Sequence, residues 1–112
     1  VDLEEAAVHI PGGPEALREM AQLLVEESTQ RLQKMREALA NGDAAAVGRE
    51  AHPMKSAAAV FGARAVVEAA ERVEHMGREG KLEEVKAGFA ELEEKAARLH
   101  AALRSMFGSD PA

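Results

Sequence analysis

The 112-residue sequence contains no cysteine, no tryptophan and no tyrosine, and it has only three phenylalanines. Without cysteine, the chain has no disulfide bond, no thiolate metal site and no cysteine nucleophile. The few aromatic rings do not provide a stacking platform for bases, and 14 lysines and arginines against 20 aspartates and glutamates give a net charge of −6. Both features disfavour binding to nucleic acid. We therefore expect no nucleic-acid partner.

Long apolar runs are also absent. The longest wholly apolar stretch, residues 57–61, is far shorter than the roughly 20 residues that cross a bilayer. The first residues include Asp2, Glu4 and Glu5, unlike those of a signal peptide. We expect a soluble, cytoplasmic protein that does not insert into a membrane. The length suits a single domain over residues 1–112 with a core that needs no covalent staples.

Alanine, by contrast, occurs 24 times, and with glutamate, leucine and arginine it gives the composition of helices. Helix breakers divide the chain at residues 9–14, residues 41–43, Gly62 and Gly80. The intervals predict a short helix at 2–8, long helices at about 14–40, 43–61, 63–79 and 82–107, and a frayed tail at 108–112. Short links between long amphipathic helices favour an all-α, antiparallel up-down four-helix bundle with a short extra N-terminal helix.

Apolar residues recur at helical spacing along each long helix and predict which side faces the core. The first stripe, interrupted by Ser28, contains Leu17, Met20, Leu24, Leu32, Met35 and Leu39, and the second contains Val47, Ala51, Met54, Ala58 and Phe61. The third contains Val66, Ala69, Ala70, Val73 and Met76, and the fourth contains Leu82, Val85, Phe89, Leu92, Ala96, Leu99, Leu103 and Met106.

One histidine differs from the other three in its surroundings. At about 100° per residue, His52 lies about 140° from Val47, on the side of its helix opposite the apolar stripe. Small side chains replace the large charged ones that usually cover an exposed helix face, so the ring stands clear of its neighbours. We expect a partner protein to dock on this face, which is made of Ala45, Gly48, Arg49, Pro53, Ser56 and Ala59.

Imidazole changes charge closer to neutral pH than any other side chain, so an exposed histidine supplies a nucleophilic nitrogen there. Attack by a ring nitrogen of His52 on an acyl phosphate gives a phosphohistidine. Lys55, one turn further on, is placed to offset the charge of the transferring group. The chain offers no second base and no nucleotide-binding loop. The residues therefore predict a carrier of phosphoryl groups that neither makes nor hydrolyses them by itself.

The segment from Ala51 to Ala63, AHPMKSAAAVFGA, resembles the A-H-x-L-K-[GS]-[SA]-[SA]-x-x-[LF]-G-A pattern of histidine phosphotransfer (HPt) domains, the carrier modules of bacterial multistep phosphorelays. Val66, Ala69, Ala70, Val73 and Glu74 stand where that family has apolar residues and a following glutamate. The resemblance implies that His52 accepts a phosphoryl group from a receiver-domain aspartate and passes it to another receiver, while Lys55 stabilises the group.

The same resemblance implies the partners: receiver domains of response regulators or of hybrid histidine kinases, whose phospho-aspartate and bound Mg²⁺ supply the other half of the reaction. It further implies a phosphotransfer intermediate without kinase activity of its own, with no cofactor and no metal site. We expect the carrier to be a monomer. Pro53 departs from the family pattern and has no amide hydrogen for the Arg49 carbonyl, so we expect a continuous but kinked helix with that carbonyl exposed beside His52.

Three other kinds of protein share features with this sequence. A di-metal carboxylate bundle needs a glutamate three residues before a histidine, and none of the four histidines has one. A histidine-kinase dimerisation domain usually has an acidic residue after its histidine, where this chain has Pro53. A helical adaptor that binds a partner through the flat face around His52 without chemistry stays open. We assign His75 to a charged solvent face, His100 to half-buried packing and His9 to a breaker cluster.

Overall fold

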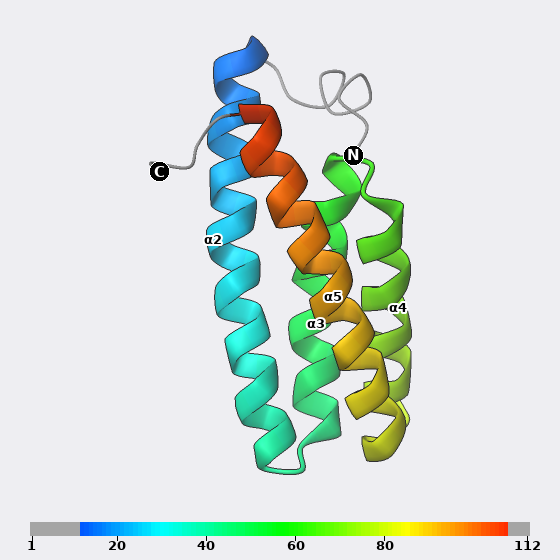
Figure 1. Cartoon of the computed structure of the whole chain (residues 1–112). Coiled ribbons are helices and arrows are strands. Elements are labelled where there is room, and N and C mark those ends of the chain that lie inside the picture. Colours follow the sequence, from blue (N-terminus) through cyan, green and yellow to red (C-terminus); the bar gives the residue numbers. More distant parts are fainter. Residues whose placement is uncertain (1–11, 108–112) are drawn as a thin grey trace.

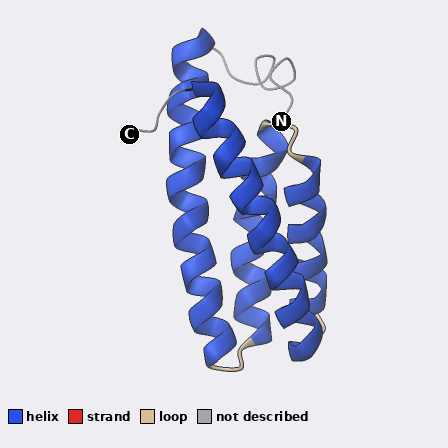
Figure 2. Ribbon diagram, viewed as in Figure 1, coloured by secondary structure: helices blue, strands red, loops and turns tan. Residues whose placement is uncertain are grey.

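Four helices make up residues 12–107, which are the residues that this computed structural model describes. Helix α2 spans Gly13–Ala40, α3 spans Ala44–Val60, α4 spans Arg64–Arg78 and α5 spans Leu82–Phe107. Each bound lies within one residue of the predicted one. Figure 2 shows only helices and loops over this range, with no strand. The short helix expected at 2–8 and the tail at 108–112 fall outside the described residues.

Successive helices run in opposite directions (Figure 1), so α2 and α4 are antiparallel to α3 and α5. The described part of the chain is therefore an all-α, up-down four-helix bundle, as predicted from the short links between long amphipathic helices. Among these four helices, none combines the length and the apolar character that crossing a membrane requires.

Helix α3 is fixed at both ends by the turns that flank it. Gly42 and Gly62 have φ angles of 69° and 63°, in the left-handed region that glycine adopts without strain. The side chain of Asp43 caps the first turn, because its Oδ1 accepts a hydrogen bond from the amide of Ala46 at 3.0 Å. These turns place the middle of α3 against α4 on one flank and α2 on the other.

The core follows the predicted stripes closely. All five core residues predicted from Val47 to Phe61 are buried. In α4, the predicted core residues Val66, Ala69, Ala70 and Val73 are buried as well. The largest fully buried side chains come from every part of the bundle: Phe61, Met35, Leu92, Leu103, Val47, Val73 and Val85. Burial of one such side chain contributes roughly 1.5–3 kcal/mol, so the shared core is the main force that assembles the helices.

Five predicted core residues lie further out than expected. Met20 and Met106 are exposed, and the remaining three, Leu39, Met76 and Leu82, are half-buried. Met20 lies at the rim of a shallow groove between α2 and α3, because the neighbouring Ala21 takes the inward position. Met106 belongs to the last turn of α5, which extends past the ends of α3 and α4 (Figure 1). The wheel of a single helix does not show where its neighbours stop.

A buried polar pair joins α2 to α5. Ser28, which interrupts the apolar stripe of α2, places its Oγ 2.6 Å from Nε2 of His100. The Ser28 hydroxyl also donates to the Leu24 carbonyl at 2.6 Å, so the histidine nitrogen is the donor of the pair. Burial, together with the nearby charge of Arg104, holds the pKa of His100 below its ordinary value of 6.5. His100 is thus more deeply buried than the half-buried position expected for it.

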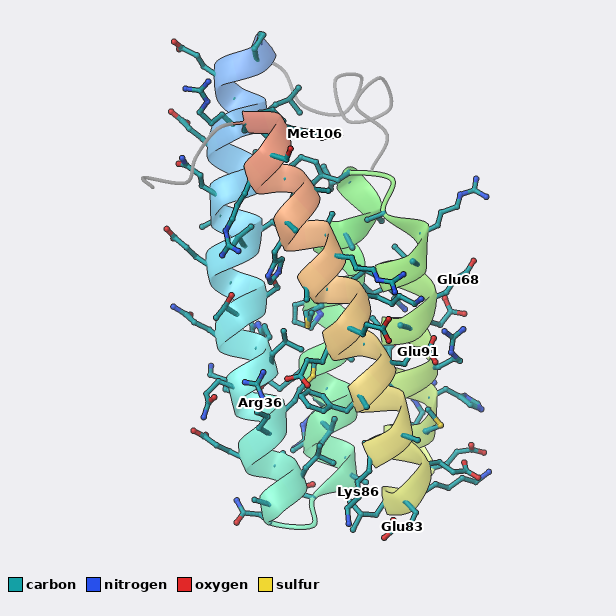
Figure 3. The ribbon with its side chains drawn as sticks, in the orientation of Figure 1. Arg36, Glu68, Glu83, Lys86, Glu91 and Met106 are labelled. Atoms are coloured by element: carbon teal, nitrogen blue, oxygen red, sulfur yellow. The ribbon has the colours of Figure 1, made fainter. Side chains whose placement is uncertain are left out.

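Ion pairs on the surface also connect α5 to its neighbours. Arg36 of α2 pairs with Glu93, and Arg72 of α4 pairs with Glu91. The Arg36 guanidinium additionally lies 5.9 Å from the centroid of the Phe89 ring. In Figure 3, Arg36 lies between α2 and α5, and Glu91 lies on the side of α5 that faces α4. Exposed pairs of this kind contribute roughly 0–1 kcal/mol each, so they are secondary to the buried core.

Candidate functional site

His52 projects from the outer side of α3, near the middle of the helix. Its side chain is 61% exposed, whereas the adjacent Ala51 and the nearby Met54 are buried in the core. Those apolar residues fix the rotation of α3 about its axis, and this rotation turns His52 outward. The exposure predicted from the helical wheel is therefore confirmed.

A glutamate on the neighbouring helix binds both residues singled out in the sequence. Oε2 of Glu74, on α4, lies 2.5 Å from Nδ1 of His52, and Oε1 of the same carboxylate lies 2.7 Å from Nζ of Lys55. His52 and Lys55 are three residues apart on α3, so one carboxylate reaches both side chains. The structure thus unites His52, Lys55 and Glu74 in one hydrogen-bonded group.

The environment of Glu74 keeps its carboxylate ionised. Its side chain is only 14% exposed, and such burial by itself would raise the pKa of a carboxyl group. The hydrogen bond from Lys55 has the larger effect and, with the hydrogen bond from His52, holds the pKa of Glu74 below its ordinary value of 4.5. Glu74 is therefore a fixed negative charge at the base of the exposed imidazole.

This contact distinguishes the two nitrogens of the His52 ring. An ionised carboxylate only accepts hydrogen bonds, so Nδ1 must be the donor in its contact with Glu74. In the neutral ring Nε2 then carries the free lone pair. With 61% of the side chain exposed, that lone pair is available to an electrophile from outside. The geometry gives His52 one nucleophilic nitrogen and one nitrogen that is held in place.

An open groove runs between α3 and α4 beside the ring. Arg49 and Arg78 line it together with His52 and Glu74. Within residues 12–107, neither guanidinium has a carboxylate within ion-pairing distance, in contrast to Arg36 and Arg72, which pair with glutamates of α5. The groove is therefore locally positive although the whole chain is acidic.

The predicted docking residues do not all share one environment. Four of them are exposed and Pro53 is half-buried; the exposed four are Ala45, Arg49, Ser56 and Ala59. Helix α3 passes through Pro53 without interruption, in agreement with the predicted continuous helix. The bend at Pro53 and the exposed Arg49 carbonyl stay predictions. The hydroxyl of Ser56 donates only a long hydrogen bond, 3.4 Å, to the carbonyl of His52.

Gly48 is the exception, because it is buried where the sequence placed it on the solvent face. Helix α4 covers it so closely that a Cβ at this position would lie 3.1 Å from the Glu74 carbonyl oxygen. The expectation that Gly48 belongs to an open, flat face was therefore wrong. Gly48 lies about 100° around α3 from Val47, on the flank of the helix, and a helical wheel contains no information on the neighbouring helix that covers this flank.

Sequence reasoning also missed the role of Glu74. It recognised a glutamate that follows Val73, without assigning it a partner. One signal was available: Val73 is a core residue, so the next residue lies about 100° around the helix, on a flank. Which flank meets α3, and that the side chain reaches His52, follows only from the packing of the two helices.

The other described histidines have structural surroundings. His75 is exposed, as predicted, and its Nε2 lies 3.3 Å from Oε1 of Glu79 on the same helix. His100 is part of the buried pair with Ser28. His9 falls outside the described residues. Over residues 12–107, no three histidine, aspartate or glutamate side chains are grouped so as to hold a metal ion.

Fold and site together define a class: a small all-helical bundle with an exposed histidine, oriented by a carboxylate of the neighbouring helix, on the outside of α3. The family model described as the Hpt domain matches residues 19–102, three quarters of the chain. The chain therefore belongs to the Hpt domain family, whose members are histidine phosphotransfer carriers of phosphorelays and not kinases. No curated protein and no solved structure matches the chain significantly.

Proposed function

We propose that this chain accepts a phosphoryl group on His52 from the aspartyl phosphate of a receiver domain and passes it to a second receiver. The observation that carries the proposal is the exposed imidazole, whose Nδ1 is bound by Glu74 and whose Nε2 is left free. Membership of the Hpt domain family supports it, because that family consists of phosphorelay carriers.

In the transfer step, the Nε2 lone pair of His52 attacks the phosphorus atom. A P–N bond forms while the P–O bond to the aspartate breaks, and the aspartate leaves as a carboxylate with the bonding electrons. The ring keeps its Nδ1 hydrogen and becomes positively charged, and the Glu74 carboxylate 2.5 Å away offsets this charge. In the second transfer, an aspartate oxygen attacks phosphorus and Nε2 leaves with its electron pair.

Lys55 stabilises the phosphoryl group in this proposal. An ammonium group has three N–H donors, and one of them is directed to Oε1 of Glu74 at 2.7 Å. The other two stay available for phosphoryl oxygens. Arg49 and Arg78 add positive charge along the groove, and this favours approach of an anionic group to a chain of net charge −6.

The receiver docks over the face of α3 around His52. The side chains of Ala45, Ser56 and Ala59 are small and exposed, so a second protein can approach the ring without meeting long side chains. Pro53 and Arg49 border this area, and Gly48 contributes to the groove that lies beside it. We further propose that the chain acts as a cytoplasmic monomer with no kinase activity, cofactor or metal of its own.

A phosphotransfer assay tests the assignment directly. The chain is incubated with a receiver domain carrying radiolabelled phosphate on its aspartate. We expect acid-labile label on the wild type and none on His52→Gln. His75→Gln is the matched control, because the His75 side chain is 66% exposed and that of His52 is 61% exposed. This control should be labelled like the wild type.

Two results would contradict the proposal. Label that persists in His52→Gln would mean that another residue accepts the phosphoryl group. Absence of label with every receiver tested, although the receivers bind the chain, would favour a helical adaptor that uses the same face without chemistry.

A further inference from the structure

Helices α3 and α4 meet at two glycines with no room for a side chain. A Cβ added to Gly77 would lie 2.7 Å from the carbonyl oxygen of Ala44 and 2.8 Å from Cα of Gly48. A Cβ added to Gly48 would lie 3.1 Å from the Glu74 carbonyl oxygen and 3.2 Å from Cα of Gly77. All these neighbours are backbone atoms, which cannot rotate away as a side chain does.

The backbone conformation does not itself require glycine at these positions. Neither Gly48 nor Gly77 has a positive φ, unlike the glycines of the turns. Gly48 lies in the interior of α3, where glycine costs about 1 kcal/mol of helix stability relative to alanine. Gly77 is the second-last residue of α4, which ends at Arg78. The steric contact explains what the two glycines provide: a close approach of α3 to α4.

This approach occurs beside the site in both helices. Gly48 precedes His52 by four residues and Gly77 follows Glu74 by three, so each glycine is about one helical turn from a residue of the site. Gly48, His52 and Glu74 line the same groove. Because a helix is stiff over one turn, the spacing at the glycines sets the spacing between the Glu74 carboxylate and the His52 ring. A hydrogen bond tolerates only a few tenths of an ångström of change.

We propose that Gly48 and Gly77 are positioning residues for His52. Their contact holds α4 close enough for Glu74 to bind Nδ1, and it thereby leaves Nε2 as the nucleophile. This inference rests on the proposed carrier function, and the two glycines act through Glu74 without touching the reacting atoms. Gly77 has the tighter contacts, so a methyl group there separates the helices more than one at Gly48.

Alanine substitutions with a matched control test this proposal. Gly88→Ala, in α5, is the control, because its closest contact is with the end of a flexible side chain and not with backbone. A Cβ there would meet Met76 Cε at 2.6 Å and Val73 Cγ2 at 3.2 Å, where a shift of a few tenths of an ångström suffices. Glu74→Ala serves as the reference for a lost contact. The readouts are the ¹⁵N chemical shifts of the two His52 ring nitrogens as a function of pH, and the rate of labelling by a phosphorylated receiver.

In Gly77→Ala we expect both nitrogen shifts to move more than halfway from the wild-type values to the values of Glu74→Ala. In Gly48→Ala the shifts should move less. In Gly88→Ala they should stay at the wild-type values. The labelling rate should fall on the order of tenfold or more in Gly77→Ala and stay at the wild-type level in Gly88→Ala. A loss of stability alone would not change the preferred site of the ring hydrogen in the folded protein.

Wild-type nitrogen shifts in folded Gly77→Ala would overturn the positioning role. If Gly77→Ala does not fold, Gly48→Ala decides in its place, because its nearest contacts of 3.1 and 3.2 Å require only a slight shift. The nitrogen shifts are measured without a partner protein. If no receiver labels the wild-type chain, the proposed carrier function is contradicted. The nitrogen shifts of the variants still test the positioning role separately.

Discussion

Glu74 gives each of its carboxylate oxygens to a different side chain of α3, Oε2 to His52 and Oε1 to Lys55. Both partners are donors, so the residue between them must accept on both sides. A glutamine has only one accepting oxygen, so it could accept from only one of the two side chains. If its NH₂ group faced His52, it would donate to Nδ1, and the ring hydrogen would move to Nε2. Only a carboxylate accepts from both Nδ1 of His52 and Nζ of Lys55, and its charge serves the ring and the ammonium together.

The charge of Glu74 depends on Lys55 more than on any other group, and this gives a pH-dependent prediction. In Lys55→Gln we expect the pKa of Glu74 to rise, because the largest lowering influence is lost while burial, which raises it, remains. A lowered carboxyl pKa stabilises the folded chain above the unfolded value near 4.5, and this contribution is lost as the pH falls through the folded value. A ¹³C titration of the Glu74 carboxyl group measures the change.

The corresponding stability measurement compares urea unfolding at neutral and acidic pH. The deficit of Lys55→Gln relative to the wild type should be present at neutral pH and should shrink below about pH 4.5. Lys34→Gln, an exposed lysine of α2 with no described ion pair, is the control and should leave the Glu74 titration unchanged. An unchanged Glu74 pKa in Lys55→Gln would show that the ion pair does not govern this carboxylate.

At the scale of the element, α3 combines a favourable start with an unfavourable residue in its interior. The Asp43 cap satisfies an amide of the first turn, and Asp or Asn at such a position stabilises a helix by about 1 kcal/mol. Pro53, in contrast, lies inside the helix and has no hydrogen to donate to the Arg49 carbonyl. The helix is nevertheless continuous, because the buried residues on either side of Pro53 keep their register with the core.

Replacement of Pro53 by alanine should therefore stabilise the protein. Alanine restores the missing hydrogen bond and has a higher helix propensity than proline. Part of this gain is offset, because the unfolded chain has more conformational freedom with alanine than with proline. We therefore expect the free energy of unfolding to rise by about 2 kcal/mol. Urea denaturation measures this change. Pro14→Ala is the control, because Pro14 occupies the first turn of α2, where proline is tolerated, and its effect should be small. A less stable Pro53→Ala would mean that the proline ring packs favourably.

The helices also show which features of the fold and the site the sequence predicts. Periodicity predicted the four helices, the buried stripe of α3 and the exposure of His52, because each depends on one helix and its own apolar residues. It did not predict that Gly48 is covered or that Glu74 reaches His52. Both depend on how closely α3 and α4 approach each other. Where they meet, this distance is set by the small residues that the two helices bring into contact. Gly48 and Gly77 are 29 positions apart, and neither predicts the contact alone.

At the scale of the whole molecule, the core contains two polar side chains among its apolar ones. Ser28 and His100 are buried and bind each other between α2 and α5, and no buried side-chain nitrogen or oxygen in the described range lacks a partner. A hydrogen bond of this kind satisfies a neutral imidazole. A charged imidazole would carry an uncompensated charge in the core, and the lowered pKa of His100 reflects this, since burial is its main cause and Arg104 adds to it.

The stability of the whole bundle should therefore fall as the pH is lowered from about 7.5 to 5.5. The unfolded chain binds a proton at His100 near the ordinary value of 6.5, whereas the folded chain resists it. The unfolded state thus gains protons first, and stability is lost below that value. In His100→Gln, whose amide can still donate to Ser28, the urea midpoint should change much less over this range. His75→Gln, at the surface, should retain the wild-type loss; an equal loss in His100→Gln would assign the effect to another group.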